Sequence, residues 1–123
     1  METPLRILAV DNEPSVTLSL RFVFAGPRYE VTCVESGMAA LARLDDDSNQ
    51  YDVMIVDQKM PQLTGAELVS ALRERGDNGK VIVVSADLSS EIRATYERMN
   101  VHEIFTKPFN VAELRSAVDR LAA

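Results

Sequence analysis

The chain has 123 residues, of which 46% are hydrophobic and 26% charged, and its 13 basic and 19 acidic residues give a net charge of −6. These values are typical of one soluble domain over residues 1–123, and they argue against direct nucleic-acid binding, which needs a basic surface. The sequence has no apolar run of membrane-spanning length and no signal peptide, and its one cysteine cannot form an internal disulfide. We therefore expect a cytoplasmic protein with no membrane partner.

The first part of the chain alternates short β-branched runs with segments of helical spacing. Strands are expected over residues 5–10, 29–34 and 51–56. The helix after the first strand should begin at Pro14, because proline is favoured in the first helical turn, and end at Ala25 before Gly26. A second helix should follow Gly37. Residues 45–49 form a polar run that indicates an exposed acidic loop rather than a metal site.

The second part continues the same alternation. Strands are expected over residues 80–84 and 102–106. A helix should begin near Thr64, where Glu67 stands at the right distance to complete a capping box. The next helix should begin at residues 89–90 and end before Asn100, which can adopt a left-handed cap, and the last should begin at Asn110.

Five strand–helix units with short connections predict an α/β fold. We expect a five-stranded parallel sheet of order 2-1-3-4-5 with helices on both faces, a flavodoxin-like arrangement. Ligands of such sheets bind beyond the carboxyl ends of the strands. Four strands end on polar residues, Asp11, Asp57, Ser85 and Lys107, which are therefore expected to form one site.

The residue types in this site are those that phosphoryl transfer requires. Two carboxylates at one sheet edge repel each other, and Mg²⁺ together with Lys107 would hold them in place. An aspartate that accepts a phosphoryl group also needs its negative charge neutralised. We interpret Asp57 as the nucleophile, Asp11 as a metal-binding group, and Lys107 and Ser85 as contacts for the phosphoryl oxygens.

Four segments carry a resemblance to the receiver domain of bacterial two-component response regulators over essentially the whole chain. They are residues 7–14, residues 57–61 with Gly65, the pair Ser85-Ala86, and residues 107–109. The resemblance implies that Asp57 accepts a phosphoryl group, with Mg²⁺ as cofactor, from a histidine kinase or a histidine phosphotransfer protein. It also implies a phosphorelay switch that controls an unknown output domain or protein, with no enzymatic activity beyond its own phosphorylation and dephosphorylation.

The resemblance assigns roles to further residues. The main-chain carbonyl of Lys59 would help to bind the metal, and the small Ala86 would leave room for the phosphoryl group. Pro108 would follow a cis peptide bond. Lys59 and Asp87 would flank the phosphoryl group at positions that tune its lifetime, with a simply solvated side chain as the alternative for Lys59.

Two positions depart from the family pattern. Asn12 stands where a second acidic residue usually binds the metal directly, so we predict weaker Mg²⁺ binding. Ile104 stands at the switch position, where the family usually has Tyr or Phe, and Phe105 should point to the opposite side of the strand. We therefore expect any conformational signal mainly around the fourth helix.

Three other functions were considered. A phosphorylation-independent receiver-like adaptor is favoured by Asn12 and Ile104 and opposed by the intact acceptor site. A haloacid-dehalogenase-like phosphatase would want a carboxylate where Lys59 stands. A flavin-binding protein would want a Ser/Thr/Gly-rich phosphate loop after the first strand. A homodimer through the fourth helix and the last strand and helix stays an open alternative.

Overall fold

The computed structural model describes residues 3–46, 50–86 and 88–122. Five parallel strands form one sheet in the order β2-β1-β3-β4-β5, which confirms the predicted fold class. The strands are β1 (Leu5–Val10), β2 (Tyr29–Val34), β3 (Val53–Val56), β4 (Val81–Ser85) and β5 (Glu103–Thr106). The helices are α1 (Pro14–Val23), α2 (Gly37–Leu44), α3 (Gly65–Glu74), α4 (Ser90–Arg98) and α5 (Val111–Ala122).

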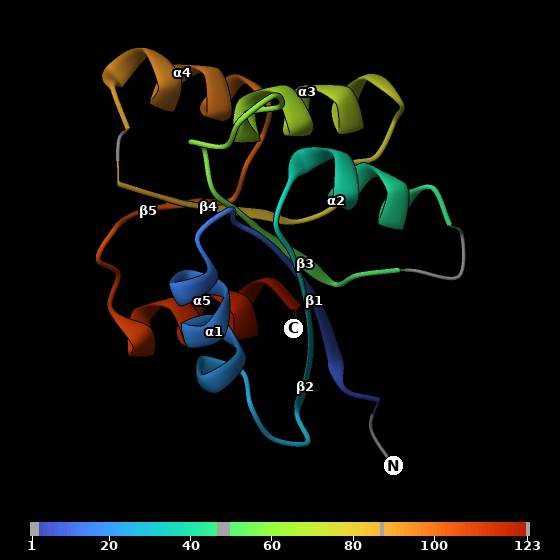
Figure 1. Cartoon of the computed structure of the whole chain (residues 1–123), viewed down its shortest axis with the longest axis vertical. Coiled ribbons are helices and arrows are strands. Elements are labelled where there is room, and N and C mark those ends of the chain that lie inside the picture. The colour runs from blue at the N-terminus through green and yellow to red at the C-terminus, as the bar shows by residue number, and fades with distance from the viewer. Residues whose placement is uncertain (1–2, 47–49, 87, 123) are drawn as a thin grey trace.

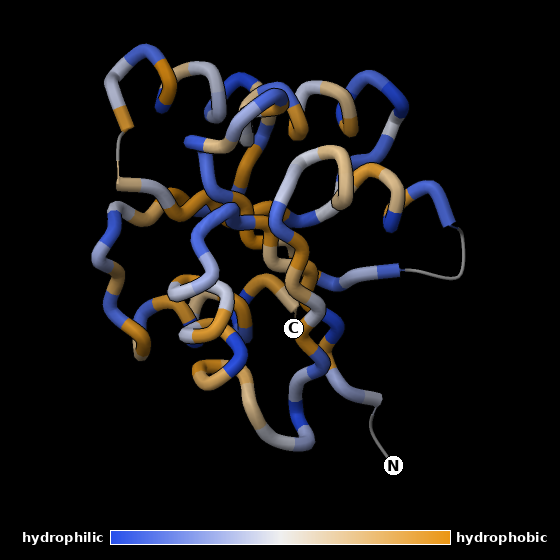
Figure 2. The backbone as a smooth tube through the Cα atoms, viewed as in Figure 1, coloured by the Kyte–Doolittle hydropathy of each residue, from blue (hydrophilic) through white to orange (hydrophobic). Residues whose placement is uncertain are grey.

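The helices cover both faces of the sheet, with α1 and α5 on one side and α2, α3 and α4 on the other (Figure 1). Successive residues of β1 alternate between the two cores, because side chains along a strand point to opposite faces. Ile7 and Ala9 pack toward α1 and α5, whereas Leu8 and Val10 pack toward the other three helices. The hydrophobic colouring of the central strands in Figure 2 reflects this burial on both faces.

Local signals at the helix ends act as the sequence predicted. Thr64 and Glu67 form a reciprocal capping box at the start of α3, and Asn100 has a left-handed φ of 59° after α4. The side chain of Asn110 accepts a hydrogen bond of 3.0 Å from the backbone N–H of Glu113 in the first turn of α5. These caps satisfy backbone groups that a helix end leaves unpaired.

Some boundaries differ from the prediction. Helix α1 ends at Val23 instead of Ala25, because Phe24 leaves the helical conformation while its N–H still bonds to the carbonyl of Leu20. Strand β3 begins at Val53, two residues later than expected. Of the predicted acidic loop, residues 47–49 lie outside the described part of the chain. None of the described helices is long and apolar enough to cross a bilayer.

Candidate functional site

The carboxyl ends of β1 and β3 bring Asp11 and Asp57 together. Val10 pairs with Val56 in the parallel register, and the backbone N–H of Asp57 donates to the carbonyl of Val10 at 2.9 Å. The two aspartates that follow are 2% and 3% exposed. The strand order therefore places two carboxylates side by side at the switch point, in a setting that is mostly withdrawn from water.

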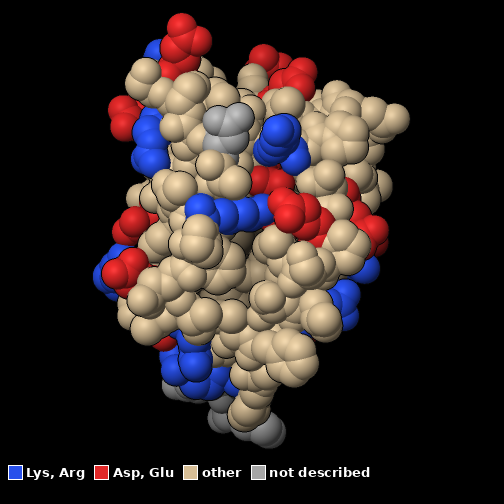
Figure 3. Space-filling view, turned by 60° about the vertical axis from the view of Figure 1, so that its left-hand side comes forward, with Lys and Arg blue, Asp and Glu red and all other residues tan. Residues whose placement is uncertain are grey.

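Lys107 supplies the positive charge at this site. Its Nζ lies 2.8 Å from a carboxylate oxygen of Asp11, 3.3 Å from one of Glu13 and 3.6 Å from one of Asp57. Burial alone would lower the pKa of Lys107, but attraction to these carboxylates, above all Asp11, outweighs it and raises that pKa. Lys107 is therefore charged at neutral pH and holds the acidic groups together. In Figure 3, acidic and basic side chains meet near the middle of the molecular face.

Within this cluster, ionisation of the Asp57 carboxyl group is disfavoured by its surroundings. Burial raises the pKa of Asp57 above its ordinary value of 3.8, and the neighbouring charge of Asp11 raises it further. Lys107, Ser85 and the backbone of Lys59 act in the opposite direction but do not cancel the rise. A buried carboxylate with an excess of negative charge beside it costs folding free energy and favours a cationic or electrophilic partner.

This cost predicts a pH-dependent effect of Asp57→Asn on stability. Because the folded-state pKa of Asp57 is raised, its penalty is absent below the unfolded-state pKa, grows as pH rises toward the folded-state value and is complete above it. We expect the asparagine variant to be more stable than the native chain at neutral pH without Mg²⁺, by about 1.4 kcal/mol for each pKa unit of the rise. Urea unfolding of both chains, near neutral pH and at about pH 3, measures the difference.

The gain should vanish at the acidic pH, where the native carboxyl is protonated in both states. An equal gain at both pH values would show that the effect comes from packing and not from charge. Asp45→Asn provides a control, since Asp45 is exposed and its bridge of 2.6 Å to Arg75 lies on the surface.

Ser85 ends β4 beside the acidic pair. The backbone N–H of Lys107 donates to the carbonyl of Ser85 at 3.0 Å, which fixes the two residues relative to each other. The Ser85 hydroxyl is fully buried and lies close enough to Asp57 to lower the pKa of that carboxyl, but it makes no hydrogen bond of good geometry with the residues that the structure describes. Because an unpaired buried hydroxyl is costly, it is available to donate to a group that enters the site.

Glu13 belongs to the site although the sequence analysis did not select it. Its backbone N–H donates to Asp11 at 2.9 Å, and one oxygen from each of Asp11, Glu13 and Asp57 can be found within 4.8 Å of the others. Asn12 and Lys59 are exposed beside this cluster. In the sequence, Glu13 could have been recognised as a site residue because it completes the polar run of residues 11–13 directly after the first strand.

The remaining predicted residues that the structure describes lie in β5 and in the segments that follow β4 and β5. The Lys107–Pro108 peptide bond is cis, and Ala86, Lys107 and Pro108 line one shallow hollow. Ile104 packs into the core under α2, α3 and α4, and Phe105 packs into the opposite core. Asp87 lies outside the described residues.

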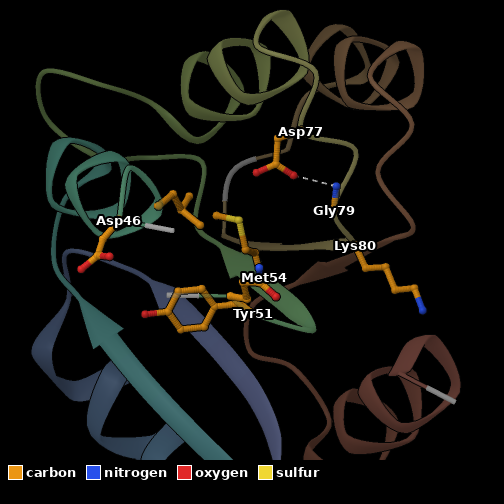
Figure 4. A pocket seen from close by; sticks show the side chains of 8 residues that line it. Asp46, Tyr51, Met54, Asp77, Gly79 and Lys80 are labelled. Carbon is orange, nitrogen blue, oxygen red and sulfur yellow. Dashed lines mark hydrogen bonds between the residues drawn. The ribbon is translucent and has the colours of Figure 1, made fainter. Parts of the chain in front are cut away.

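A second hollow, of about 320 Å³, opens at the amino ends of β3 and β4, away from the predicted site (Figure 4). Two of its polar groups already have partners. Asp77 accepts a hydrogen bond of 2.9 Å from Gly79, and Lys80 bonds to the carbonyl of Leu121, pointing away from Asp77 in the figure. We assign no ligand to this hollow.

Comparisons with known proteins identify the family of the chain. The family model of the response regulator receiver domain matches residues 7–119. The response regulator RppA of Synechocystis is 32% identical over 110 residues, which cover 89% of this chain and 47% of RppA. The response regulator MprA of Mycobacterium sp. (strain KMS) is 32% identical over 111 residues, covering 90% of this chain and 47% of MprA.

Solved structures are similar over nearly the whole chain. The receiver domain of the Francisella response regulator 1452 has a TM-score of 0.87 at 29% identity and covers 96% of both chains. The response regulator TrrA of Thermotoga maritima, solved in complex with Mg²⁺ and beryllium fluoride, has a TM-score of 0.81 at 32% identity and covers 95% of this chain and 98% of its own.

The chain belongs to the response regulator receiver domain family. It is a signalling domain of the two-component type, and its cluster of Asp11, Glu13 and Asp57 is typical of a phosphorylation and Mg²⁺ site. The chain spans about half the length of the curated relatives it matches.

Proposed function

We propose that Asp57 accepts a phosphoryl group from a phosphohistidine on a histidine kinase or a histidine phosphotransfer protein. The observation that carries the proposal is that the buried Asp57 carboxylate lies 3.6 Å from Lys107 Nζ. It is at the same edge of the sheet as the unpaired Ser85 hydroxyl. A carboxylate oxygen of Asp57 would form a bond to phosphorus while the phosphorus–nitrogen bond of the donor breaks. The electron pair of that bond would leave with the donor imidazole.

Lys107 and Ser85 would stabilise the transferred group. The Lys107 ammonium lies between Asp11 and Asp57, so a phosphoryl oxygen on Asp57 would be within its reach. The Ser85 hydroxyl would gain the hydrogen-bond acceptor that it lacks among the described residues. Ala86, which follows Ser85, has no side chain beyond Cβ and would leave space for the phosphoryl oxygens. These contacts stabilise negative charge where it develops.

The residues present also fit Mg²⁺. Three carboxylates and one ammonium leave a formal charge of −2, which a divalent cation would neutralise. Asp11, Glu13 and Asp57, with the main-chain carbonyl of Lys59 and the amide of Asn12, offer the oxygen ligands that Mg²⁺ prefers. When bound, Mg²⁺ would neutralise charge on the phosphoryl oxygens. The similarity to TrrA, solved with Mg²⁺ and beryllium fluoride, supports this set.

The affinity for Mg²⁺ should depend on the charges at positions 12 and 13. We expect Glu13→Gln to weaken Mg²⁺ binding by about 10-fold and Asn12→Asp to strengthen it by a similar factor, because each changes one charge at the cluster. Calorimetric titration with Mg²⁺ measures both affinities. Glu30→Gln is the control, since Glu30 is exposed on β2 and pairs with Arg6 at 3.6 Å. If Asn12→Asp leaves the affinity unchanged, the missing acid does not limit metal binding.

The proposed function is tested by incubating the native chain with a small phosphodonor, with and without Mg²⁺. We expect Mg²⁺-dependent addition of one phosphoryl group, which mass spectrometry can map to Asp57 after borohydride reduction of the acyl phosphate. A chain that takes up no phosphoryl group at any Mg²⁺ concentration would instead support the phosphorylation-independent adaptor.

The proposal extends to the cellular setting. The transfer of the phosphoryl group to Asp57 would take place in the cytoplasm, where the single Cys33 would stay a free thiol. Phosphorylation would act on an output domain or protein, and the chemistry of the domain would be limited to its own phosphorylation and dephosphorylation.

A further inference from the structure

Helix α4 buries one of its side chains completely. Of the residues Ser90–Arg98, Tyr96 is the one that is buried, and its exposed fraction is 0%. Tyr96 packs in the core on the α2–α4 side of the sheet, which also contains Leu68 and Val83. The other residues of α4 are partly or fully exposed, and Ile92 packs against the same core from its edge, so Tyr96 is the deepest contact that α4 makes.

The hydroxyl of Tyr96 reaches the residue that follows the phosphoacceptor. It donates a hydrogen bond to the side-chain oxygen of Gln58. The same oxygen accepts a hydrogen bond of 2.9 Å from the backbone N–H of Ala66 in α3. The main-chain carbonyl of Gln58 accepts another, of 3.0 Å, from the N–H of Gly65. Gln58 therefore connects the loop after Asp57 to the start of α3 and to α4.

This connection is closely packed. A Cβ placed on Gly65 would lie 2.4 Å from the main-chain oxygen of Asp57 and 2.6 Å from the Tyr96 hydroxyl, so the phosphoacceptor backbone, Gly65 and Tyr96 fill one small space. Burial, and then the charge of Asp57, raise the pKa of Tyr96 above its ordinary value of 10.0. The hydroxyl therefore stays protonated at neutral pH and remains a hydrogen-bond donor.

We propose that Tyr96 is a positioning residue that couples the phosphoryl site to α4 through its hydrogen bond to Gln58. The proposal rests on phosphorylation at Asp57. Phosphorylation replaces the single negative charge of the Asp57 carboxylate with the up to about two negative charges of the phosphoryl group. Any shift of the backbone that follows Asp57 moves Gln58 with it. Because the Tyr96 hydroxyl is bound to Gln58 and packed closely against Gly65, a displacement of Gln58 would move α4 or break this hydrogen bond.

Through Tyr96, an aromatic side chain links α4 to the site on a face of the sheet where the core residue of β5 is Ile104. Ile104 on β5 packs into the same core as Tyr96 but carries no polar group. The described contacts of α4 with β5 include one hydrogen bond of 3.1 Å, from Arg93 to the Thr106 hydroxyl, on the exposed surface. An exposed bond of this kind competes with water, so it transmits less than the part-buried bond from Tyr96 to Gln58.

The test uses amide NMR spectra of the native chain, Tyr96→Phe and Tyr29→Phe, recorded with and without Mg²⁺ and beryllium fluoride. In the native chain we expect shifts both at the site, in residues 57–59 and 85–86, and in α4. In Tyr96→Phe the site shifts should persist while the α4 shifts fall to the level seen in β2. Tyr29→Phe is the matched control, because it also removes one tyrosine hydroxyl, which bonds to Asp119 at 2.8 Å in the opposite core.

Each outcome decides between the proposals. Full α4 shifts in Tyr96→Phe would overturn the coupling and leave phosphorylation at Asp57 intact. Loss of the α4 shifts in Tyr29→Phe as well would show a general effect of stability and would also overturn it. A native chain without site shifts would overturn the proposed function and the coupling together. If Tyr96→Phe does not fold, Gln58→Met removes the acceptor from the other side and should give the same selective loss.

Discussion

Asp57→Asn is expected to abolish phosphoryl incorporation from a small phosphodonor. The asparagine amide keeps the size and most of the contacts of the side chain but lacks a nucleophilic carboxylate oxygen. Because the residue is 3% exposed and tied to β1 by the bond from its N–H to Val10, the backbone should stay in place. Intact-mass spectrometry after incubation with the phosphodonor and Mg²⁺ measures the product directly.

The control for this loss is Asp45→Asn, which removes an exposed carboxylate at the end of α2 and should be phosphorylated like the native chain. Incorporation into Asp57→Asn at the native level would place the acceptor elsewhere in the chain. The expected rise in stability of the same variant at neutral pH separates a chemical loss from a folding defect, since a misfolded chain would not become more stable.

Gly65→Ala is expected to destabilise the protein by about 2 kcal/mol, the usual size of an overpacking effect. The added Cβ would lie 2.4 Å from the main-chain oxygen of Asp57, far inside van der Waals contact. Alanine normally favours a helix over glycine by about 0.5–1 kcal/mol. A net loss of stability would therefore come from the clash. Urea unfolding measures it, and phosphoryl incorporation should fall as well because the backbone of Asp57 has to shift.

Gly79→Ala is the matched control. Its Cβ would meet one carboxylate oxygen of Asp77 at 3.1 Å, and this side chain can move aside. We expect a change within about 0.5 kcal/mol, as for most surface substitutions. If Gly65→Ala were as mild as this control, the close packing of Gly65 against Asp57 and Tyr96 would not limit the site.

The position of the site was largely predictable because it lies on strand ends. Asp11, Asp57 and Lys107 follow β1, β3 and β5, and Ser85 is the last residue of β4, and parallel strands place their carboxyl ends at one edge of the sheet. Glu13 was not selected, because its participation depends on the turn after β1, in which its N–H bonds to Asp11. A turn of this kind is decided by a side-chain contact and has no periodic signal.

The class of fold, the order of the elements and the residues at the strand ends could all be predicted from the amino-acid sequence. Those features follow from local chemistry: hydrophobic periodicity, caps such as Thr64 with Glu67, and β-branched runs buried on both faces. The contact of Tyr96 with Gln58, in contrast, is visible only in the folded chain. Its helical spacing with Ile92 and Met99 indicates core packing alone, while its hydrogen bond to Gln58 joins residues 38 positions apart. Such a contact depends on how α4 packs against the loop after β3. The residues next to Tyr96 in the sequence do not indicate how far α4 lies from that loop.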